Sequence, residues 1–87
     1  MYTITFSDDA LADIRLLKQN EPRYTRKLIS LIEELKEHPR TGTGQAERLK
    51  HYEGEVWSRR ISQKHRLVYR IIENRVEVYV LSAYGHY

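Results

Sequence analysis

The stretch HRLVYRIIENRVEVYVLSA, residues 65–83, decides the fold of this chain. Apolar and polar residues alternate along it on both sides of Glu73-Asn74, and a period of two is typical of β-strands. The pattern predicts strands over residues 65–72 and 75–83, joined by a two-residue hairpin turn. In that register one face is wholly apolar, with Ile71 opposite Val76, Tyr69 opposite Val78 and Leu67 opposite Val80, while Arg70 faces Glu77 on the other side.

A further predicted strand precedes this hairpin. Residues 56–62 alternate in the same way, and a three-residue loop over 62–64 keeps Trp57 on the apolar side. This register places Arg60 directly opposite Arg66 on the other face. Two cations that face each other across strands are destabilising unless an anion lies between them. The pattern therefore indicates a phosphate site on that face.

The N-terminal half carries the signals of one strand and two helices. Residues 2–6 alternate as a short strand, and Ser7 is a typical N-cap residue followed by two aspartates. Apolar residues then recur at helical spacing in two segments. The first stripe consists of Leu11, Ile14 and Leu17, and the second, between Pro22 and His38-Pro39, consists of Tyr24, Leu28, Leu31, Ile32 and Leu35.

With a short strand over residues 47–51, these elements predict an α+β fold. It has an N-terminal strand and a two-helix hairpin packed on one face of a mainly antiparallel, twisted β-sheet. No repeat, linker or low-complexity tract interrupts residues 1–87, so we expect a single domain. A chain of 87 residues buries a thin core, and it has no cysteine to reinforce that core.

Composition also bounds the cellular setting and the chemistry. The first residues lack the basic and apolar regions of a signal peptide, and no stretch is long enough to span a membrane. We therefore expect a cytoplasmic protein without a membrane partner. No closely spaced histidines, glycine-rich phosphate loop or nucleophile elbow is present, so neither a metal nor another cofactor is expected.

The positive charge is concentrated in the second half of the chain. The net charge is +3, and residues 48–66 contain six Lys or Arg against two Glu, with Tyr52, Trp57 and Tyr69 nearby. Cations beside aromatic rings suit a phosphate backbone with exposed bases, as in single-stranded RNA. A solvated cationic face is the plainer alternative on composition alone. The candidate contacts for RNA or phosphate are Lys50, Arg59 and Arg60.

Cleavage of RNA without a metal requires a base, a cation and an acid, and the sequence offers each. Glu47 is a candidate base for the 2′-hydroxyl proton, Arg60 and Arg66 can hold the phosphate, and His86 can protonate the leaving oxygen. Tyr87 can stack on a base or place its phenol near the phosphate. Each also has an ordinary alternative: a surface carboxylate, a solubilising face, an incidental histidine near a chain end, or simple packing.

The segments GQAERLKH, WSRRISQKHRLVYR and the closing HY together resemble the YoeB branch of the RelE/ParE toxin superfamily. The resemblance covers essentially the whole chain. It implies a toxin that cleaves mRNA in the A site of the 70S ribosome, that is blocked by a YefM/Phd-type antitoxin and that can form a homodimer. It also implies that Glu47 is the general base, that Arg66 stabilises the transition state, and that His86 and Tyr87 complete the catalytic set.

The same resemblance gives Arg60 a place in the site and Lys50 a contact with RNA or the ribosome. This sequence departs from it where prolines usually flank the glutamate, because Ala46 and Arg48 stand there, and Gly85 precedes His86. These departures bear on rate and cleavage preference more than on reaction type. Two other readings remain: a ParE-like toxin directed at gyrase, and a non-catalytic module that docks on the ribosome, RNA or an acidic partner.

Overall fold

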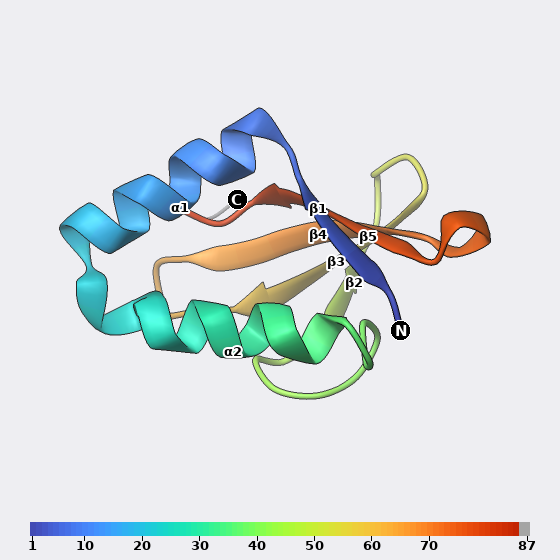
Figure 1. The fold of residues 1–87 in the computed structure, drawn as a ribbon, viewed down its shortest axis with the longest axis horizontal. Helices are drawn as coiled ribbons and strands as arrows, with labels where there is room; N and C mark the ends of the chain where they lie inside the picture. Colours follow the sequence, from blue (N-terminus) through green and yellow to red (C-terminus); the bar gives the residue numbers. More distant parts are fainter. Residues whose placement is uncertain (86–87) are drawn as a thin grey trace.

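A computed structural model describes residues 1–85, which form a five-stranded sheet with two helices (Figure 1). The elements are β1 Thr3–Phe6, α1 Asp8–Asn20, a 3-10 turn Pro22–Tyr24, α2 Thr25–Leu35, β2 Glu47–Leu49, β3 Glu55–Arg60, β4 Arg66–Ile72, a 3-10 turn Glu73–Arg75 and β5 Glu77–Ser82. The strand order is β1-β5-β4-β3-β2, and only β1 and β5 run parallel. The predicted α+β class and mainly antiparallel sheet are confirmed.

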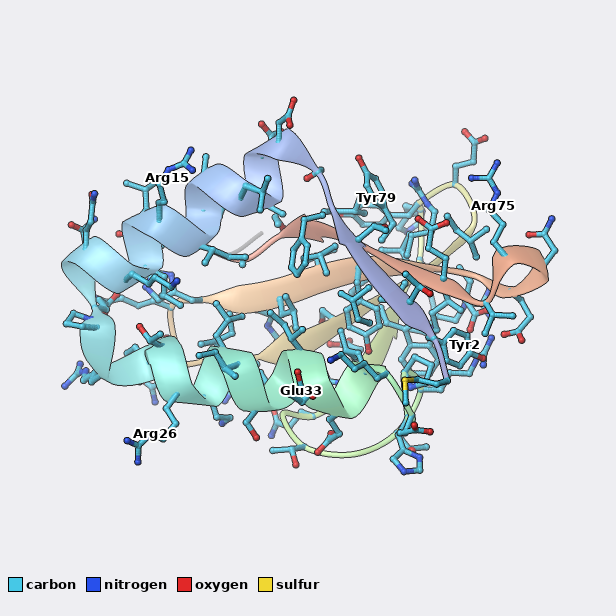
Figure 2. The ribbon with its side chains drawn as sticks, viewed as in Figure 1. Tyr2, Arg15, Arg26, Glu33, Arg75 and Tyr79 are labelled. Atoms are coloured by element: carbon cyan, nitrogen blue, oxygen red, sulfur yellow. The ribbon has the colours of Figure 1, made fainter. Side chains whose placement is uncertain are left out.

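Helix α1 begins where the sequence predicts. The Ser7 side chain accepts a hydrogen bond of 3.0 Å from the backbone N–H of Ala10, which satisfies one of the unpaired donors of the first turn. The apolar stripe starts one residue earlier than expected. Ala10 and Leu17 are fully buried, whereas Leu11 is 45% exposed. Arg15 of α1 and Arg26 of α2 point away from the sheet (Figure 2).

Helix α2 carries the second predicted stripe into the core. Leu28, Leu31 and Leu35 are buried, and Tyr24 and Ile32 pack beside them. The helix starts at Thr25 because Pro22 opens a 3-10 turn first. Both helices share one core with the sheet residues Ile61, Leu67, Tyr69, Ile71, Val78 and Val80. They therefore cover one face of the sheet, and we call the opposite one the distal face.

The hairpin between β3 and β4 has the predicted register. Arg60 pairs with Arg66, and the backbone N–H groups of Ile61 and Ser62 both donate to the carbonyl of His65. The Ser62 hydroxyl accepts from the N–H groups of Lys64 and His65 and so closes the three-residue loop. The structure thus confirms that two arginines face each other across the strands.

The register predicted for the β4–β5 hairpin is wrong by two residues. Four residues, Glu73–Val76, make the connection, and Val76 ends it with a φ of 49°. Ile71 consequently lies opposite Val78 and Tyr69 opposite Val80, while Arg70 faces Tyr79 rather than Glu77. A shift of two keeps every side chain on its own face of the sheet, so the predicted apolar face survives.

A β-bulge interrupts β5 near its end. Tyr69 pairs with Val80, but the next residue of β4, Val68, pairs with Ser82, so Leu81 is an extra residue in β5. Bulges bend the strand that contains them and increase its local twist. The bend brings the residues after Ser82 alongside the first residue of β4, where the backbone N–H of Arg66 donates to the carbonyl of Gly85 at 3.0 Å.

Candidate active site on the distal face

Three neighbouring strands bring the predicted base and cations to the distal face. Glu47 of β2 lies opposite Ser58 of β3, and Ser58 lies opposite Val68 of β4. Arg60 lies two residues after Ser58 on β3, and Arg66 lies two residues before Val68 on β4. Because alternate residues of a strand share a face, all these side chains leave the sheet away from the helices. Glu47, Ser58, Arg60 and Arg66 thus place a carboxylate, a hydroxyl and two guanidinium groups together on the distal face.

Glu47 and Arg66 lie close enough to act on one group. Their nearest side-chain atoms, Oε1 of Glu47 and Nη1 of Arg66, are 3.7 Å apart. Nη1 of Arg66 also donates to the hydroxyl of Ser58 at 3.2 Å, and Ser58 is fully buried, which fixes the guanidinium. The Glu47 side chain is 62% exposed and that of Arg66 only 20% exposed. The carboxylate therefore stands open to solvent beside a cation that the sheet holds in place.

Arg60 adds a second cation to this site. It is half-buried and lies opposite Arg66, and its guanidinium has no hydrogen-bond or ion-pair partner within residues 1–85. A guanidinium presents a planar set of donors that matches a phosphate group. The pair is therefore suited to an anion that bridges the two strands.

The backbone before Glu47 is held by β3. The carbonyl of Gly44 accepts a hydrogen bond of 2.6 Å from the N–H of Arg60, and Gly44 has a φ of +85°. A Cβ atom at this position would lie 3.0 Å from the carbonyl oxygen of Arg60. This close approach ties the segment leading to Glu47 to the strand that carries Arg60.

Lys50 lies just after β2 and is exposed. It makes no hydrogen bond or ion pair with any other part of residues 1–85, Glu47 and Arg66 included. Its predicted contact with RNA or the ribosome stays a prediction. His86 and Tyr87 lie outside the described residues, and so does their predicted part in the site. The last described residue, Gly85, is bonded to the backbone of Arg66.

The prediction that Arg59 binds RNA or phosphate is wrong, because its side chain points into the core. Arg59 is completely buried on the face covered by the helices. Its Nε donates to the Tyr69 hydroxyl at 3.0 Å, and Nη1 forms an ion pair of 2.6 Å with Glu34. The remaining donors reach three backbone carbonyls, those of His38, Thr41 and Thr43. All five N–H groups of the guanidinium are therefore used.

Arg59 organises the loop that leads from α2 to β2. Its three carbonyl partners span residues 38–43, and Glu34 also accepts from the backbone N–H and hydroxyl of Thr43. Burial raises the pKa of Glu34, but the hydrogen bonds from Thr43 and Arg59 outweigh it and leave that pKa below its usual value. The pair of a buried Arg59 and a partly exposed Glu34 therefore holds the loop through a network of hydrogen bonds.

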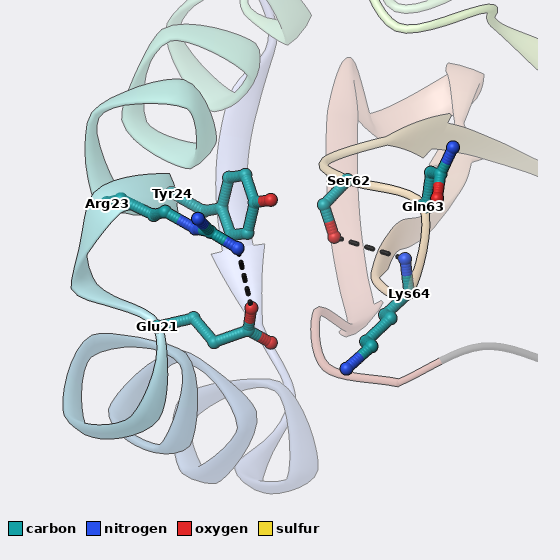
Figure 3. A pocket seen from close by; sticks show the side chains of 6 residues that line it. All are labelled: Glu21, Arg23, Tyr24, Ser62, Gln63 and Lys64. Atoms are coloured by element: carbon teal, nitrogen blue, oxygen red, sulfur yellow. Dashed lines mark hydrogen bonds and ion pairs between the residues drawn. The ribbon is translucent and has the colours of Figure 1, made fainter.

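A shallow hollow lies apart from the distal-face site, between the α1–α2 junction and the β3–β4 loop (Figure 3). Its lining residues are Glu21, Arg23, Tyr24, Ser62, Gln63 and Lys64. Figure 3 shows Glu21 and Arg23 on one wall and Lys64 on the other. None of the predicted site residues lines it. Within residues 1–85, no helix is long and apolar enough to cross a membrane. The same residues contain no group of three or more His, Cys, Asp or Glu side chains that could hold a metal ion.

Comparison with known proteins identifies the family. The model of the YoeB-like toxins of bacterial type II toxin-antitoxin systems matches residues 6–87. This chain belongs to that family. A curated YoeB toxin of Mycobacterium bovis is 36% identical over 87 residues, which is the whole length of both chains.

Solved structures of YoeB toxins have the same fold. A YoeB/ParE toxin from Agrobacterium tumefaciens is 29% identical, with a TM-score of 0.88 over 98% of this chain and 99% of that one. The YoeB dimer from Staphylococcus aureus is 32% identical, with a TM-score of 0.83 over 99% and 98%. The YoeB-YefM heterotetramer from the same species is 31% identical, with a TM-score of 0.81 over 100% and 99%. The isolated RelE toxin of Escherichia coli shares the fold, with a TM-score of 0.76, so the protein is a toxin of RelE-like fold.

Proposed function

We propose that this YoeB-like toxin is a ribosome-dependent endoribonuclease that cleaves mRNA in the A site without a metal ion and so inhibits translation. The observation that carries the proposal is the pairing of Glu47 with Arg66 at 3.7 Å on the distal face, with Arg60 opposite Arg66. A carboxylate and two guanidinium groups supply a base and the positive charge that phosphoryl transfer requires. Translating ribosomes place the activity in the cytoplasm.

The reaction assigns one task to each group. The Glu47 carboxylate takes the proton of the 2′-hydroxyl, and the 2′ oxygen attacks the adjacent phosphorus. The bond from phosphorus to the 5′ oxygen breaks, and His86 gives that oxygen a proton. Arg66 stabilises the extra charge on the phosphate during this step. The products are a 2′,3′-cyclic phosphate, or the 3′-phosphate formed from it, and a 5′-hydroxyl.

The remaining predicted residues support binding of the RNA. Arg60 holds the phosphate from the neighbouring strand, and Lys50 contacts the RNA or ribosome beside β2. Tyr87 stacks on a base or places its phenol near the phosphate. These roles follow from charge, position and resemblance to the YoeB family, and each is tested by substitution.

Two protein partners belong to the same proposal. The Staphylococcus aureus relatives were solved as a YoeB dimer and as a YoeB-YefM heterotetramer. By similarity, an antitoxin of the YefM type blocks this toxin, and a second copy of the chain can pair with it. A complex with a YefM-type antitoxin should leave mRNA intact in a cleavage assay on ribosomes.

The test is a translation reaction on one defined mRNA, with fragment ends mapped by primer extension. The wild-type protein is expected to cut at the codon in the A site and to leave the same mRNA intact without ribosomes. Arg66→Ala should reduce the cleavage rate by about a hundredfold or more, because it removes charge stabilisation at the phosphate. Arg70→Ala is the matched control, since Arg70 stands on the same face of β4 and is bonded to the carbonyl of Glu53.

The alternatives give different results in this assay. A non-catalytic binding module would hold the ribosome and leave the mRNA whole. A toxin directed at gyrase would instead inhibit DNA supercoiling in a purified system. Either result with wild-type protein contradicts the proposal.

A further inference from the structure

The segment that follows β5 is fastened at each of its three described residues. The N–H of Ala83 donates to Oδ2 of Asp13 at 3.0 Å, and Asn20 donates to the hydroxyl of Tyr84 at 3.1 Å. The N–H of Gly85 donates to Nδ1 of His65 at 2.7 Å. The N–H of Arg66 donates to the carbonyl of Gly85 at 3.0 Å. Helix α1 and the start of β4 thus hold residues 83–85 from two sides.

His65 is the centre of this arrangement. It lies directly before the predicted catalytic arginine Arg66 and is only 4% exposed. Its ring stacks on that of Tyr84, with centroids 4.4 Å apart and an interplanar angle of 27°. Its Nε2 is hydrogen-bonded to Oε2 of Glu21, at the end of α1. A histidine that serves only to begin a strand needs none of these contacts.

The contacts also fix which ring nitrogen carries the proton. A backbone N–H can only donate, so Nδ1 of His65 accepts from Gly85 with its lone pair. The proton of the neutral ring is therefore on Nε2, where it is donated to the carboxylate of Glu21. The hydrogen bond with His65 is the main cause of the lowered pKa of Glu21. Glu21 thus orients the ring so that Nδ1 faces Gly85.

We infer that His65, oriented by Glu21, is a positioning residue that holds Gly85 beside Arg66 and thereby sets the rate of mRNA cleavage. The inference rests on the proposed function, because it assumes that His86, the next residue after Gly85, is the acid. His65 does not contact the phosphate in this account. It acts through the backbone of Gly85, one residue before the proposed acid.

Two substitutions separate the two hydrogen bonds of His65. In His65→Asn the amide oxygen can take the place of Nδ1, which keeps an acceptor for Gly85 and loses the bond to Glu21. In His65→Gln the amide nitrogen can take the place of Nε2, which keeps the donor to Glu21 and loses the acceptor. If His65 only stabilised the fold through Glu21, His65→Gln would keep more of the wild-type activity than His65→Asn. The positioning role predicts that His65→Asn keeps more.

The first measurement is hydrogen exchange of the Gly85 amide in ¹⁵N-labelled full-length protein. We expect Gly85 to lose about three- to tenfold in protection in His65→Gln relative to wild type and to keep most of it in His65→Asn. The ring ¹⁵N shifts of wild-type His65 should show Nδ1 without a proton. Equal protection of Gly85 in all three proteins would overturn the inference, whether or not the protein cleaves RNA.

The second measurement is mRNA cleavage on ribosomes by the same three proteins. In His65→Gln we expect kcat to fall by at least about tenfold with KM unchanged, because misplacement of a reacting group lowers the rate more than binding. His65→Asn should retain more of the wild-type kcat. If wild type cleaves and the variants do not differ from it, the positioning role of His65 is rejected and the proposed function is unaffected. If wild type is inactive, the proposed function is rejected, and the exchange data still decide whether His65 holds Gly85.

Discussion

The backbone N–H of Arg66 is hydrogen-bonded to the carbonyl of Gly85 at 3.0 Å. The same Arg66 extends its guanidinium to within 3.7 Å of Glu47. One residue therefore links the predicted base on β2 with the chain segment that precedes His86. This connection depends on the bulge at Leu81, which re-aims the end of β5.

Adjacent arginines on β3 should behave in opposite ways when they are replaced. Arg59→Met removes five hydrogen bonds inside the core and leaves Glu34 without its buried partner. The free energy of unfolding should fall by about 3–5 kcal/mol, as it does when one member of a buried ion pair is removed. Urea denaturation measures this loss, and a change below about 1 kcal/mol would contradict the role given to Arg59.

Arg60→Met is the control for that experiment and a test of the site. Arg60 has no side-chain partner within residues 1–85 and faces another cation, so its loss should change the unfolding free energy by less than about 1 kcal/mol. The substitution should instead weaken mRNA cleavage. A variant that loses stability while it keeps full activity would place Arg60 outside the phosphate site.

Gly44→Ala should destabilise the protein and slow cleavage. The new Cβ would meet the carbonyl oxygen of Arg60 at 3.0 Å, and an alanine is strained at a φ of +85°. We expect a loss of about 1–3 kcal/mol in unfolding free energy, and a displaced Glu47. Gly54→Ala is a suitable control, because Gly54 also has a positive φ but its nearest neighbours belong to the flexible side chain of Arg70. Equal losses in the two variants would argue against the Arg60 contact.

Stability should depend on Glu55 in a defined pH range. Hydrogen bonds from Arg40, at 2.7 and 3.0 Å, are the main cause of the lowered pKa of Glu55. A carboxyl group whose pKa is lower in the folded state stabilises the fold above its unfolded pKa, and that stabilisation is lost as the pH falls. Glu55→Gln should therefore unfold more easily than wild type at pH 7. The difference should shrink below about pH 4; a difference that is constant from pH 7 to pH 3 would be the contrary result.

His86→Gln should abolish cleavage while the protein still binds ribosomes. Glutamine keeps a polar side chain of similar reach but has no proton to give at neutral pH. Sedimentation with ribosomes measures binding, and primer extension on a defined mRNA measures cleavage. A variant that cuts as fast as wild type would remove His86 from the mechanism.

The sequence predicts the register of a hairpin where residues of its own loop determine that register. The Ser62–Lys64 loop fixes its own register, because the Ser62 hydroxyl closes it, and the predicted pairing of Arg60 with Arg66 followed. The second hairpin was misread because Glu73-Asn74 looks like a two-residue turn. The connection instead has four residues, and its last residue is Val76. Val76 has a positive φ, which a β-branched residue rarely adopts.

The prediction for Arg59 is wrong because a charged side chain is usually exposed, whereas this one is buried. Alternation with Trp57 and Ile61 puts Arg59 on the inner face, but its acceptors come from residues 34–43 and from Tyr69, which no local pattern connects to it. The contacts of His65 are not predicted for the same reason. Its partners Glu21 and Gly85 are 44 and 20 residues away along the chain. The one local signal is that His65 lies two residues before Leu67, so that the two side chains share the inner face of the sheet.

The chemical ends of the cut mRNA test the central claim most directly. Fragments from a ribosome assay are treated with polynucleotide kinase and labelled ATP, with and without prior phosphatase. Cleavage by Glu47, Arg66 and His86 predicts that the downstream fragment labels without phosphatase, because it starts with a 5′-hydroxyl, and that the upstream fragment ends in a cyclic or 3′-phosphate. A downstream 5′-phosphate with an upstream 3′-hydroxyl would contradict attack by the 2′ oxygen and the account built on it.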